Sequence, residues 1–271
     1  MNTQSKGLAV ITGASAGIGA VYADRLARRG YDLLLVARDT RRMDKLAERL
    51  TDRTGRRIEV MTADLTNRGD VARLEQFLRD DQRVTMLVNN AGLGATSLLL
   101  NSDAAEMSRM ITLNVEALMR LTYAAVPEFV TRGAGTIVNI ASIVAIAPEV
   151  LNGVYGATKA FVLAFSQSLR HELANTGVQV QVVLPGATAT NFWNIAGRPV
   201  ENLPQQIVMT AEDMVDAALA GLDHGEFVTI PALPDAGQWE KYEAARQAMM
   251  PTLSHAEPAE RYGVGLETAI R

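Results

Sequence analysis

The stretch GLAVITGASAGIG, residues 7–19, joins a short apolar, β-rich run to the start of a helical pattern. Gly13 permits a tight turn, Gly17 leaves room for a pyrophosphate beside the backbone, and Gly19 lets the following helix pack close to a sheet. The free N–H groups and the dipole at the start of that helix favour an anion. This order of strand, glycine turn and helix predicts the phosphate-binding turn of a dinucleotide-binding fold. The alternative is a glycine-rich turn without a ligand.

Apolar runs alternate with longer helical patterns along the rest of the chain. Seven continuous apolar runs indicate strands of a parallel sheet whose two faces are both covered; they span residues 7–12, 32–37, 57–63, 85–91, 135–142, 178–186 and 226–230. Helices are expected at residues 17–29, 41–54, 68–80, 103–131 and 211–223, with one more around Tyr155 that ends near residues 175–177. The pattern predicts an α/β class, doubly wound Rossmann fold with a seven-stranded, mostly parallel sheet and helices on both faces.

The composition changes after the last predicted strand. Residues 1–230 are expected to form a single dinucleotide-binding and catalytic domain. Residues 231–271 contain one short helical pattern between prolines and then a polar tail. We expect this C-terminal appendage to be partly helical and to pack on the domain or on a partner subunit.

Composition and charge exclude several classes of function. The chain has 271 residues, a net charge of −4 and no cysteine, so disulfides and Cys-ligated metals are excluded. Its three histidines, His171, His224 and His255, are far apart, which argues against any metal site. The charge gives no general attraction to nucleic acid or to an anionic membrane. The N-terminus has no secretory pattern and no window suits a membrane span, so a cytoplasmic, soluble protein is expected.

The second predicted strand ends in LLLVARDTRR, residues 33–42, where a dinucleotide fold reads the adenosine ribose. An acid here selects NAD, whereas an arginine accommodates the 2′-phosphate of NADP. Ala37 stands at the strand end and Arg38 follows it. The sequence therefore favours NADP (NADPH) over NAD, while Asp39 keeps NAD as the alternative.

A tyrosine and a lysine stand four residues apart in VYGATKA, residues 154–160. On a helix this spacing places both side chains on one face. An ammonium near a phenol favours the phenolate, so Lys159 is expected to lower the pKa of Tyr155 and make it a usable general acid or base. The alternative is an ordinary core aromatic beside a solvated charge.

Further motifs follow in a fixed order, and together with the glycine turn they resemble the short-chain dehydrogenase/reductase family over residues 8–230. They are NNAG at residues 89–92, Asn114, Ser142, the Tyr155–Lys159 pair, and Pro185-Gly186 followed by Thr188 and Thr190. The resemblance implies an NAD(P)-dependent enzyme that acts on a CH–OH or C=O group. A non-catalytic, NADP-binding sensor or regulatory protein is the alternative.

The resemblance also implies roles for four catalytic residues. Tyr155 would exchange a proton with the substrate oxygen, and Ser142 would hold that oxygen. Lys159 would lower the pKa of Tyr155 and bind the nicotinamide ribose. Asn114 would anchor a water that links Lys159 to solvent.

Cofactor contacts are implied along the whole motif set. The residues are Gly13, Ser15, Gly17, Ile18, Gly19, Arg38, Asp64, Leu65, Asn90, Ala91, Gly92, Tyr155, Lys159, Pro185, Gly186, Thr188 and Thr190. Asp64 and Leu65 would lie near the adenine, and Asn90, Ala91 and Gly92 would flank the adenosine side. Thr190 and the backbone near Thr188 would hold the carboxamide.

The segment after Pro185-Gly186 resembles the family's mobile substrate lid. Phe192, Trp193 and Ile195 would cover an apolar ligand, although Trp193 could equally be a subunit contact. Because few charges accompany these side chains, we expect a small-molecule substrate that is an uncharged ketone, aldehyde or alcohol. Arg198 is the exception that could bind an anion. The resemblance also implies a homodimer or homotetramer.

Overall fold

Seven strands form one parallel sheet in the computed structural model, which describes residues 5–264. The strand order is β3-β2-β1-β4-β5-β6-β7. The strands are β1 (Leu8–Thr12), β2 (Asp32–Ala37), β3 (Ile58–Thr62), β4 (Val84–Asn89), β5 (Gly135–Ile140), β6 (Val178–Val183) and β7 (Val228–Thr229). The predicted α/β fold is confirmed, with all strand pairs parallel.

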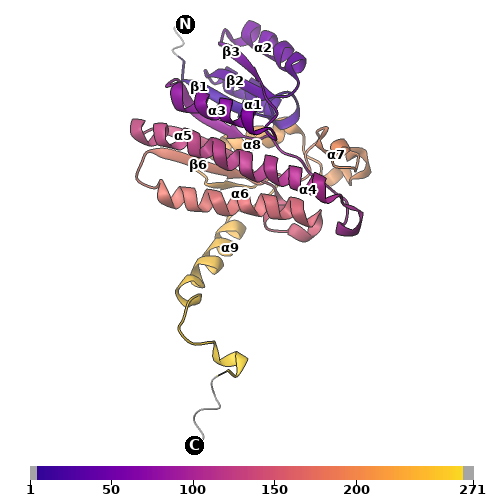
Figure 1. The fold of residues 1–271 in the computed structure, drawn as a ribbon, viewed down its shortest axis with the longest axis vertical. Coiled ribbons are helices and arrows are strands. Elements are labelled where there is room, and N and C mark those ends of the chain that lie inside the picture. The colour runs from indigo at the N-terminus through magenta and orange to yellow at the C-terminus, as the bar shows by residue number, and fades with distance from the viewer. Residues whose placement is uncertain (1–4, 265–271) are drawn as a thin grey trace, which may run out of the picture. The chain divides into compact units, whose positions relative to one another are not determined.

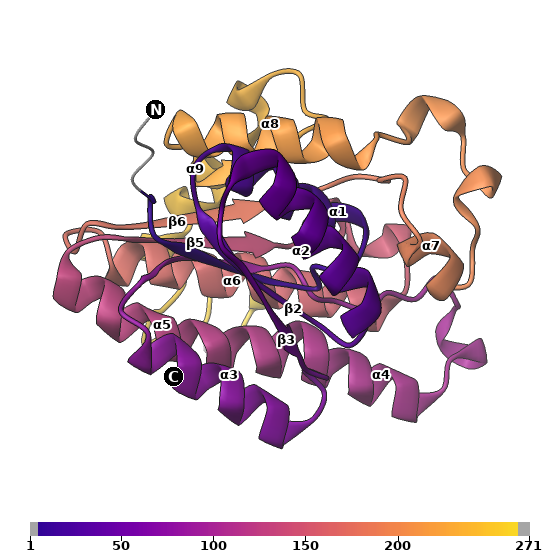
Figure 2. The same cartoon turned by 90° about the horizontal axis from the view of Figure 1, so that it is seen from above.

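Helices cover both faces of this sheet, so apolar residues predominate on both faces of the strands. Figure 2 shows α1 (Gly17–Arg28) and α8 (Ala211–Asp223) on one side, and α3 (Arg68–Asp80) and α5 (Leu118–Arg132) on the other. In β1, Ala9 and Ile11 belong to the core under α1 and α8, while Leu8 and Val10 belong to the core under α3 and α5. The remaining helices of the described chain are α2 (Thr40–Thr54), α4 (Ala104–Ile111), α6 (Gly153–Glu172), α7 (Phe192–Ile195) and α9 (Ala236–Ala248).

The long helical region predicted over residues 103–131 is confirmed, and its helix type changes in the middle. The structure has α4, then a π-helical segment over Thr112–Ala117, and then α5. Figure 1 shows α4 and α5 following one another in one rod. The wide turn contains Asn114, whose side chain hydrogen-bonds residues of two other segments. Such π-bulges often mark functional positions.

Several predicted strands also end too late. The strand predicted over residues 85–91 ends at Asn89, and the one over residues 178–186 ends at Val183. Residues 90–92 leave the sheet to line a cleft. Pro185 has no N–H for the next strand bond. The residues that continue an apolar run therefore turn away from the sheet at its carboxyl edge.

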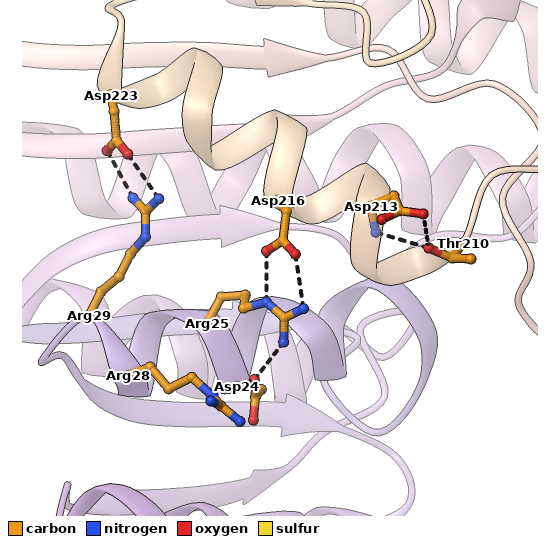
Figure 3. Close-up of polar contacts among 8 residues, drawn as sticks. All are labelled: Asp24, Arg25, Arg28, Arg29, Thr210, Asp213, Asp216 and Asp223. Atoms are coloured by element: carbon orange, nitrogen blue, oxygen red, sulfur yellow. Dashed lines mark hydrogen bonds and ion pairs between the residues drawn. The ribbon is translucent and has the colours of Figure 1, made fainter.

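Two arginine–aspartate pairs join α1 to α8 (Figure 3). Arg25 binds both carboxylate oxygens of Asp216 at 2.7 and 3.0 Å, and Arg29 binds Asp223 at 2.8 and 2.9 Å. Asp24 supports Arg25 at 2.7 Å. These bidentate pairs fix the position of α1, which begins in the glycine turn, relative to α8.

The chain divides into two units, residues 1–232 and residues 233–271. In the second unit, α9 carries Trp239 and Tyr242, whose ring centroids lie 5.3 Å apart, and none of its residues is buried. Residues 265–271 of the predicted appendage lie outside the described part of the chain. Among the described helices, none is long and apolar enough to cross a membrane.

Candidate active site

A cleft of about 910 Å³ runs along the carboxyl ends of the strands. It begins at the turn after β1, passes the ends of β2 and β3, and continues past β4, β5 and β6. Strand order reverses between β1 and β4, and this is where doubly wound sheets bind their ligands. The cleft brings together Gly13, Ser15, Gly17, Ile18, Arg38, Asp64, Leu65, Asn90, Ala91, Gly92, Ser142, Tyr155, Lys159, Pro185, Gly186, Thr188 and Thr190.

The glycine turn has the shape that a pyrophosphate requires. Gly13 and Gly17 have φ values of +68° and +54°, a region that favours glycine. A Cβ on Gly13 would lie 2.9 Å from the Cα of Ala91, and one on Gly17 would lie 3.1 Å from the methyl of Thr190. The α1 helix starts with no side-chain cap and no acid in its first turn. Its N–H groups are therefore available to an anion, and the turn fits a phosphate.

Gly19 serves the packing of this turn and does not line the cleft. A Cβ at this position would collide with the carbonyl oxygen of Gly13. The close approach holds the first turn of α1 against the strand end. Gly19 therefore contributes to the shape of the loop.

A set of hydrogen bonds behind the glycine turn was not predicted from the sequence. The buried Thr12 hydroxyl oxygen accepts hydrogen bonds from the backbone N–H groups of Asn90 and Ala91, both at 3.0 Å. The Asn90 side chain donates to the carbonyl oxygen of Thr12 at 2.8 Å. Asn90 therefore fixes the turn after β1 to the turn after β4, in addition to lining the cleft. Its contacts depend on β1 and β4 being neighbours, so local sequence patterns do not reveal them.

At the ribose end of the cleft, the structure shows which contacts Asp39 makes. Its carboxylate accepts the backbone N–H of Arg42 at 3.0 Å and caps α2, and it also pairs with the Arg42 guanidinium at 3.3 Å. Within residues 5–264, no ion pair involves Arg38. Arg38 is exposed and lines the cleft. The Asp39 carboxylate is thus engaged in capping α2, whereas the Arg38 guanidinium makes no ion pair within residues 5–264.

Asp64 lines the same cleft as these arginines. It accepts hydrogen bonds from the Thr66 backbone N–H at 2.9 Å and from the Thr66 hydroxyl at 2.8 Å. These bonds lower the pKa of Asp64, and the charges of Arg38 and Arg109 lower it further. Arg109 lines the cleft from α4, and Leu113 lies one turn further along the chain. The sequence did not point to Arg109 and Leu113, because their relation to the cleft depends on distant contacts.

Tyr155 is 5% exposed and lies at the other end of the cleft, on α6. The α6 helix is started by Asn152, whose side chain accepts the N–H groups of Val154 at 2.9 Å and Tyr155 at 3.3 Å. Burial raises the pKa of Tyr155 to about 12, and a hydrogen bond with Ser142 opposes that rise. The phenol is therefore protonated throughout the neutral range.

Lys159 is also buried, and its Nζ donates to the carbonyl oxygen of Ile140 at 2.9 Å. The ammonium lies 5.8 Å from the centroid of the Tyr155 ring. Burial lowers the pKa of Lys159 to about 8. The expected low pKa of Tyr155 is not found in this structure, because burial raises the pKa of the phenol and lowers that of the neighbouring Lys159.

Asn114 stands behind the cleft and does not line it. Its Oδ1 accepts the Leu93 N–H at 2.8 Å, and its Nδ2 donates to the Leu93 carbonyl at 2.8 Å and to the Thr158 hydroxyl at 3.1 Å. The side chain is only 2% exposed. The polar atoms of the carboxamide are thus already engaged by protein groups.

The segment over residues 187–209 lies over the apolar part of the cleft. Its two ends are tied by backbone hydrogen bonds from Ala189 to Met209 at 2.8 Å and from Met209 to Ala187 at 2.9 Å. The ring of Phe192 lies 5.7 Å from that of Tyr155. Trp193 is buried and its indole N–H donates to the Thr188 carbonyl at 3.0 Å. The indole therefore anchors this segment within its own chain.

A parallel sheet with a glycine cradle at its switch point, and a buried tyrosine and lysine on the adjoining helix, defines a dinucleotide-dependent oxidoreductase of the Rossmann class. Residues 7–198 match the short chain dehydrogenase family. The chain belongs to this family and is a short-chain dehydrogenase/reductase acting on alcohol or carbonyl groups.

Solved structures of two relatives superpose along nearly the whole chain. A short-chain dehydrogenase from Sphingobium yanoikuyae in complex with NADPH is 50% identical, with a TM-score of 0.92, and the match covers 94% of this chain and 99% of that one. The bulky-bulky ketone specific alcohol dehydrogenase from Comamonas testosteroni is 46% identical, with a TM-score of 0.88 and coverage of 96% and 99%. Sulfoacetaldehyde reductase 2 from Chromohalobacter salexigens is 38% identical over 190 residues, covering 68% of this chain and 74% of the relative.

Proposed function

We propose that this chain is an NADP-dependent oxidoreductase that interconverts a carbonyl and an alcohol, with Tyr155 as the general acid and base. One observation carries the proposal. A single cleft contains both the phosphate-shaped glycine turn and the buried group of Ser142, Tyr155 and Lys159. A bound nicotinamide supplies or accepts the hydride.

The buried residues would manage the proton and the charge on the substrate oxygen. Ser142 and Tyr155 both line the cleft, and Ser142 lies near enough to influence the pKa of the phenol, so a carbonyl oxygen bound between them would meet two hydroxyl donors. Because the pKa of Tyr155 is about 12, the phenol starts a reduction protonated and gives its proton to the oxygen. The Lys159 ammonium lies close enough to stabilise the phenolate that remains.

The preference for NADP rests on the charges at the other end of the cleft. Arg38 is unpaired among the described residues, and Arg42 stands one helical turn away, held by Asp39. A guanidinium here suits a 2′-phosphate, whereas a ribose hydroxyl needs a free acid. The relative from Sphingobium yanoikuyae was solved with NADPH, which supports the same choice. Gly13, Ser15, Gly17 and Ile18 would hold the pyrophosphate, and Asp64 and Leu65 the adenine.

We infer an uncharged substrate with large apolar groups. Beyond Tyr155 the cleft is lined mainly by apolar side chains, namely Val144, Val150, Leu151, Phe192, Trp193, Ile195, Leu203 and Ile207. Gly94 makes room for Phe192, since a Cβ there would collide with the ring. The Comamonas testosteroni relative is specific for bulky-bulky ketones, which fits this lining. Arg198 is the one cation that the lid segment contributes.

We also propose that the chain forms a homodimer or homotetramer through α5 and α6. Tyr123 on α5 is 68% exposed and stacks on Phe165 of α6 at 6.3 Å. Phe165 in turn stacks on Phe161 at 5.6 Å. A row of aromatic rings with Tyr123 exposed and Phe161 and Phe165 half-buried suits a subunit interface, where aromatic residues are enriched.

The test is turnover followed at the reduced-nicotinamide absorbance band, with NADPH and NADH in parallel. The panel contains diaryl and other bulky ketones, small ketones, aldehydes and sulfoacetaldehyde as the anionic member. We expect turnover of bulky ketones with NADPH and much weaker turnover with NADH. Preference for NADH would overturn the cofactor assignment, and preference for sulfoacetaldehyde would overturn the substrate class.

A further inference from the structure

Thr158 connects the two segments that carry Asn114 and Tyr155. It lies on α6 between Tyr155 and Lys159 and is 2% exposed. Its hydroxyl donates to the Tyr155 carbonyl oxygen at 2.8 Å and accepts from the Asn114 Nδ2 at 3.1 Å. This one hydroxyl thus joins the π-helical segment to α6 beside the reacting group.

The Leu93 backbone and the Thr158 hydroxyl together fix the orientation of the Asn114 carboxamide, since the Nδ2 donates to the Leu93 carbonyl at 2.8 Å as well as to Thr158. A hydroxyl has one proton, and Thr158 uses it on the Tyr155 carbonyl. Toward Asn114 the Thr158 oxygen can therefore only accept a hydrogen bond. The carboxamide atom facing it must be the donor, Nδ2. Its oxygen is then left for the Leu93 N–H, which it accepts at 2.8 Å. Without the hydroxyl, one buried N–H of the carboxamide has no partner and the preference between the two orientations weakens.

The Asn114 oxygen and the Lys159 ammonium border the same small space at Gly92. A Cβ on Gly92 would lie 3.2 Å from the Asn114 Oδ1 and 3.6 Å from the Lys159 Nζ. Rotating or shifting the carboxamide therefore changes the polar surroundings of Lys159. A donor N–H in place of the carbonyl oxygen would destabilise the protonated amine.

We propose that Thr158 is a positioning residue for the reaction, acting through Asn114 on Lys159. The inference rests on the proposed function, since it assumes that Tyr155 and Lys159 take part in the reaction. It concerns a residue that does not itself line the cleft.

The same helix offers a matched control two turns away. The buried Ser166 hydroxyl donates to the Val162 carbonyl at 2.7 Å and accepts from the Asn139 Nδ2 at 2.9 Å. Ser166 thus makes the same pair of bonds, to a helix carbonyl and to a buried asparagine on another element. It differs from Thr158 in lying away from the cleft.

The experiment compares Thr158→Val, Thr158→Ser and Ser166→Ala in the full-length chain. The readouts are thermal unfolding, kcat and KM for NADPH, and the pKa of Lys159 from the Cε shifts of isotope-labelled lysine in the cofactor-free protein. The chain has four lysines, Lys6, Lys45, Lys159 and Lys241, so their signals can be assigned by substitution.

We expect Thr158→Val and Ser166→Ala to lose similar amounts of thermal stability. Thr158→Val should also lower kcat about tenfold, as the loss of one buried hydrogen bond allows, with KM for NADPH changed less than about twofold. The pKa of Lys159 should fall in Thr158→Val alone. Thr158→Ser keeps the hydroxyl and should retain the wild-type kcat and Lys159 pKa.

Two results would overturn the proposal. One is a Thr158→Val protein with an unchanged Lys159 pKa and kcat, and the other is a Ser166→Ala protein that shows the same changes in both. Failure of the proposed function is a separate outcome, because it would appear as full turnover in Tyr155→Phe. The Lys159 pKa is measured without turnover, so it still decides the role of Thr158 in that case.

Discussion

The two ends of the cleft are built in opposite ways. At the reacting end, Tyr155 and Lys159 are buried and each is held by hydrogen bonds to neighbouring segments. At the ribose end, Arg38 and Asp39 are exposed, and Asp39 is engaged by Arg42. Burial moves the pKa of Lys159 to about 8 and that of Tyr155 to about 12.

This difference separates the chemistry from the choice of cofactor. Interactions between exposed charges weaken as salt rises, whereas buried hydrogen bonds hardly respond to it. Substitutions at the reacting end should therefore change kcat at any ionic strength. Substitutions at the ribose end should change the preference between NADPH and NADH, and more strongly at low salt.

Lys159→Met should give the largest effect among the following variants, a fall in kcat of about 10²–10⁴-fold. It should also change how stability depends on pH. Because the folded-state pKa is about 8 and the ordinary value is 10.5, the unfolded chain holds an extra proton between these values. The wild-type free energy of unfolding therefore gains from Lys159 as pH rises through this window.

Urea unfolding at pH 7, 8, 9 and 10 measures that gain. The difference in the free energy of unfolding, Lys159→Met minus wild type, should be largest at pH 7. It should fall above pH 8, because only the wild-type protein becomes more stable there. A difference between the two proteins that is constant from pH 7 to pH 10 would contradict the burial of a titrating lysine at the reacting end.

Gly19→Ala should come next, because it damages the turn that both ends share. The added methyl collides with the Gly13 carbonyl oxygen, so the turn must move. We expect a loss of about 1–3 kcal/mol in the free energy of unfolding and weaker NADPH binding, measured by denaturant titration and by fluorescence. Gly153→Ala is the control, since no atom lies within 4 Å of its added Cβ, and it should show neither loss.

Arg38→Ala should act on the cofactor alone. Removing a hydrogen bond to a charged phosphate should lower kcat/KM for NADPH about tenfold and leave the value for NADH unchanged. The loss should shrink as salt is raised from 20 to about 500 mM. Arg49→Ala removes the same charge from the exposed side of α2, outside the cleft, and should have little effect. Equal losses with the two cofactors would show that Arg38 does not read the 2′-phosphate.

Asp223→Asn should give the smallest effect. Its pair with Arg29 is bidentate but more than half of the aspartate side chain is exposed. Such pairs contribute about 0–1 kcal/mol. We expect a small fall in thermal stability and an unchanged kcat. A large loss of activity would mean that the contact between α1 and α8 controls the geometry of the glycine turn.

Local spacing allowed the central parts of the site to be predicted from the sequence. Gly13, Gly17 and Gly19 follow one strand, and Tyr155 and Lys159 share one helix face, so each motif is complete within a few residues. The parallel sheet followed from the continuous apolar runs, and the structure confirms it.

The remaining features depend on pairings between distant segments. The π-helical turn at Asn114 reflects bonds to Leu93 and Thr158, and no local pattern distinguishes it from a straight helix. From the sequence Asp39 is a possible ribose ligand, but in the structure its carboxylate caps α2. The pKa of Tyr155 was misjudged because the i,i+4 spacing gives proximity to Lys159 but not the extent of burial.

The most direct test of the account measures NADPH affinity and turnover side by side in wild type and Tyr155→Phe. The phenol is expected to supply the proton and to contribute little to cofactor binding, which the glycine turn and Arg38 should dominate. The account predicts that kcat with a bulky ketone falls about 10²–10⁴-fold while the Kd for NADPH stays within about twofold. Turnover that survives the loss of the hydroxyl would contradict it.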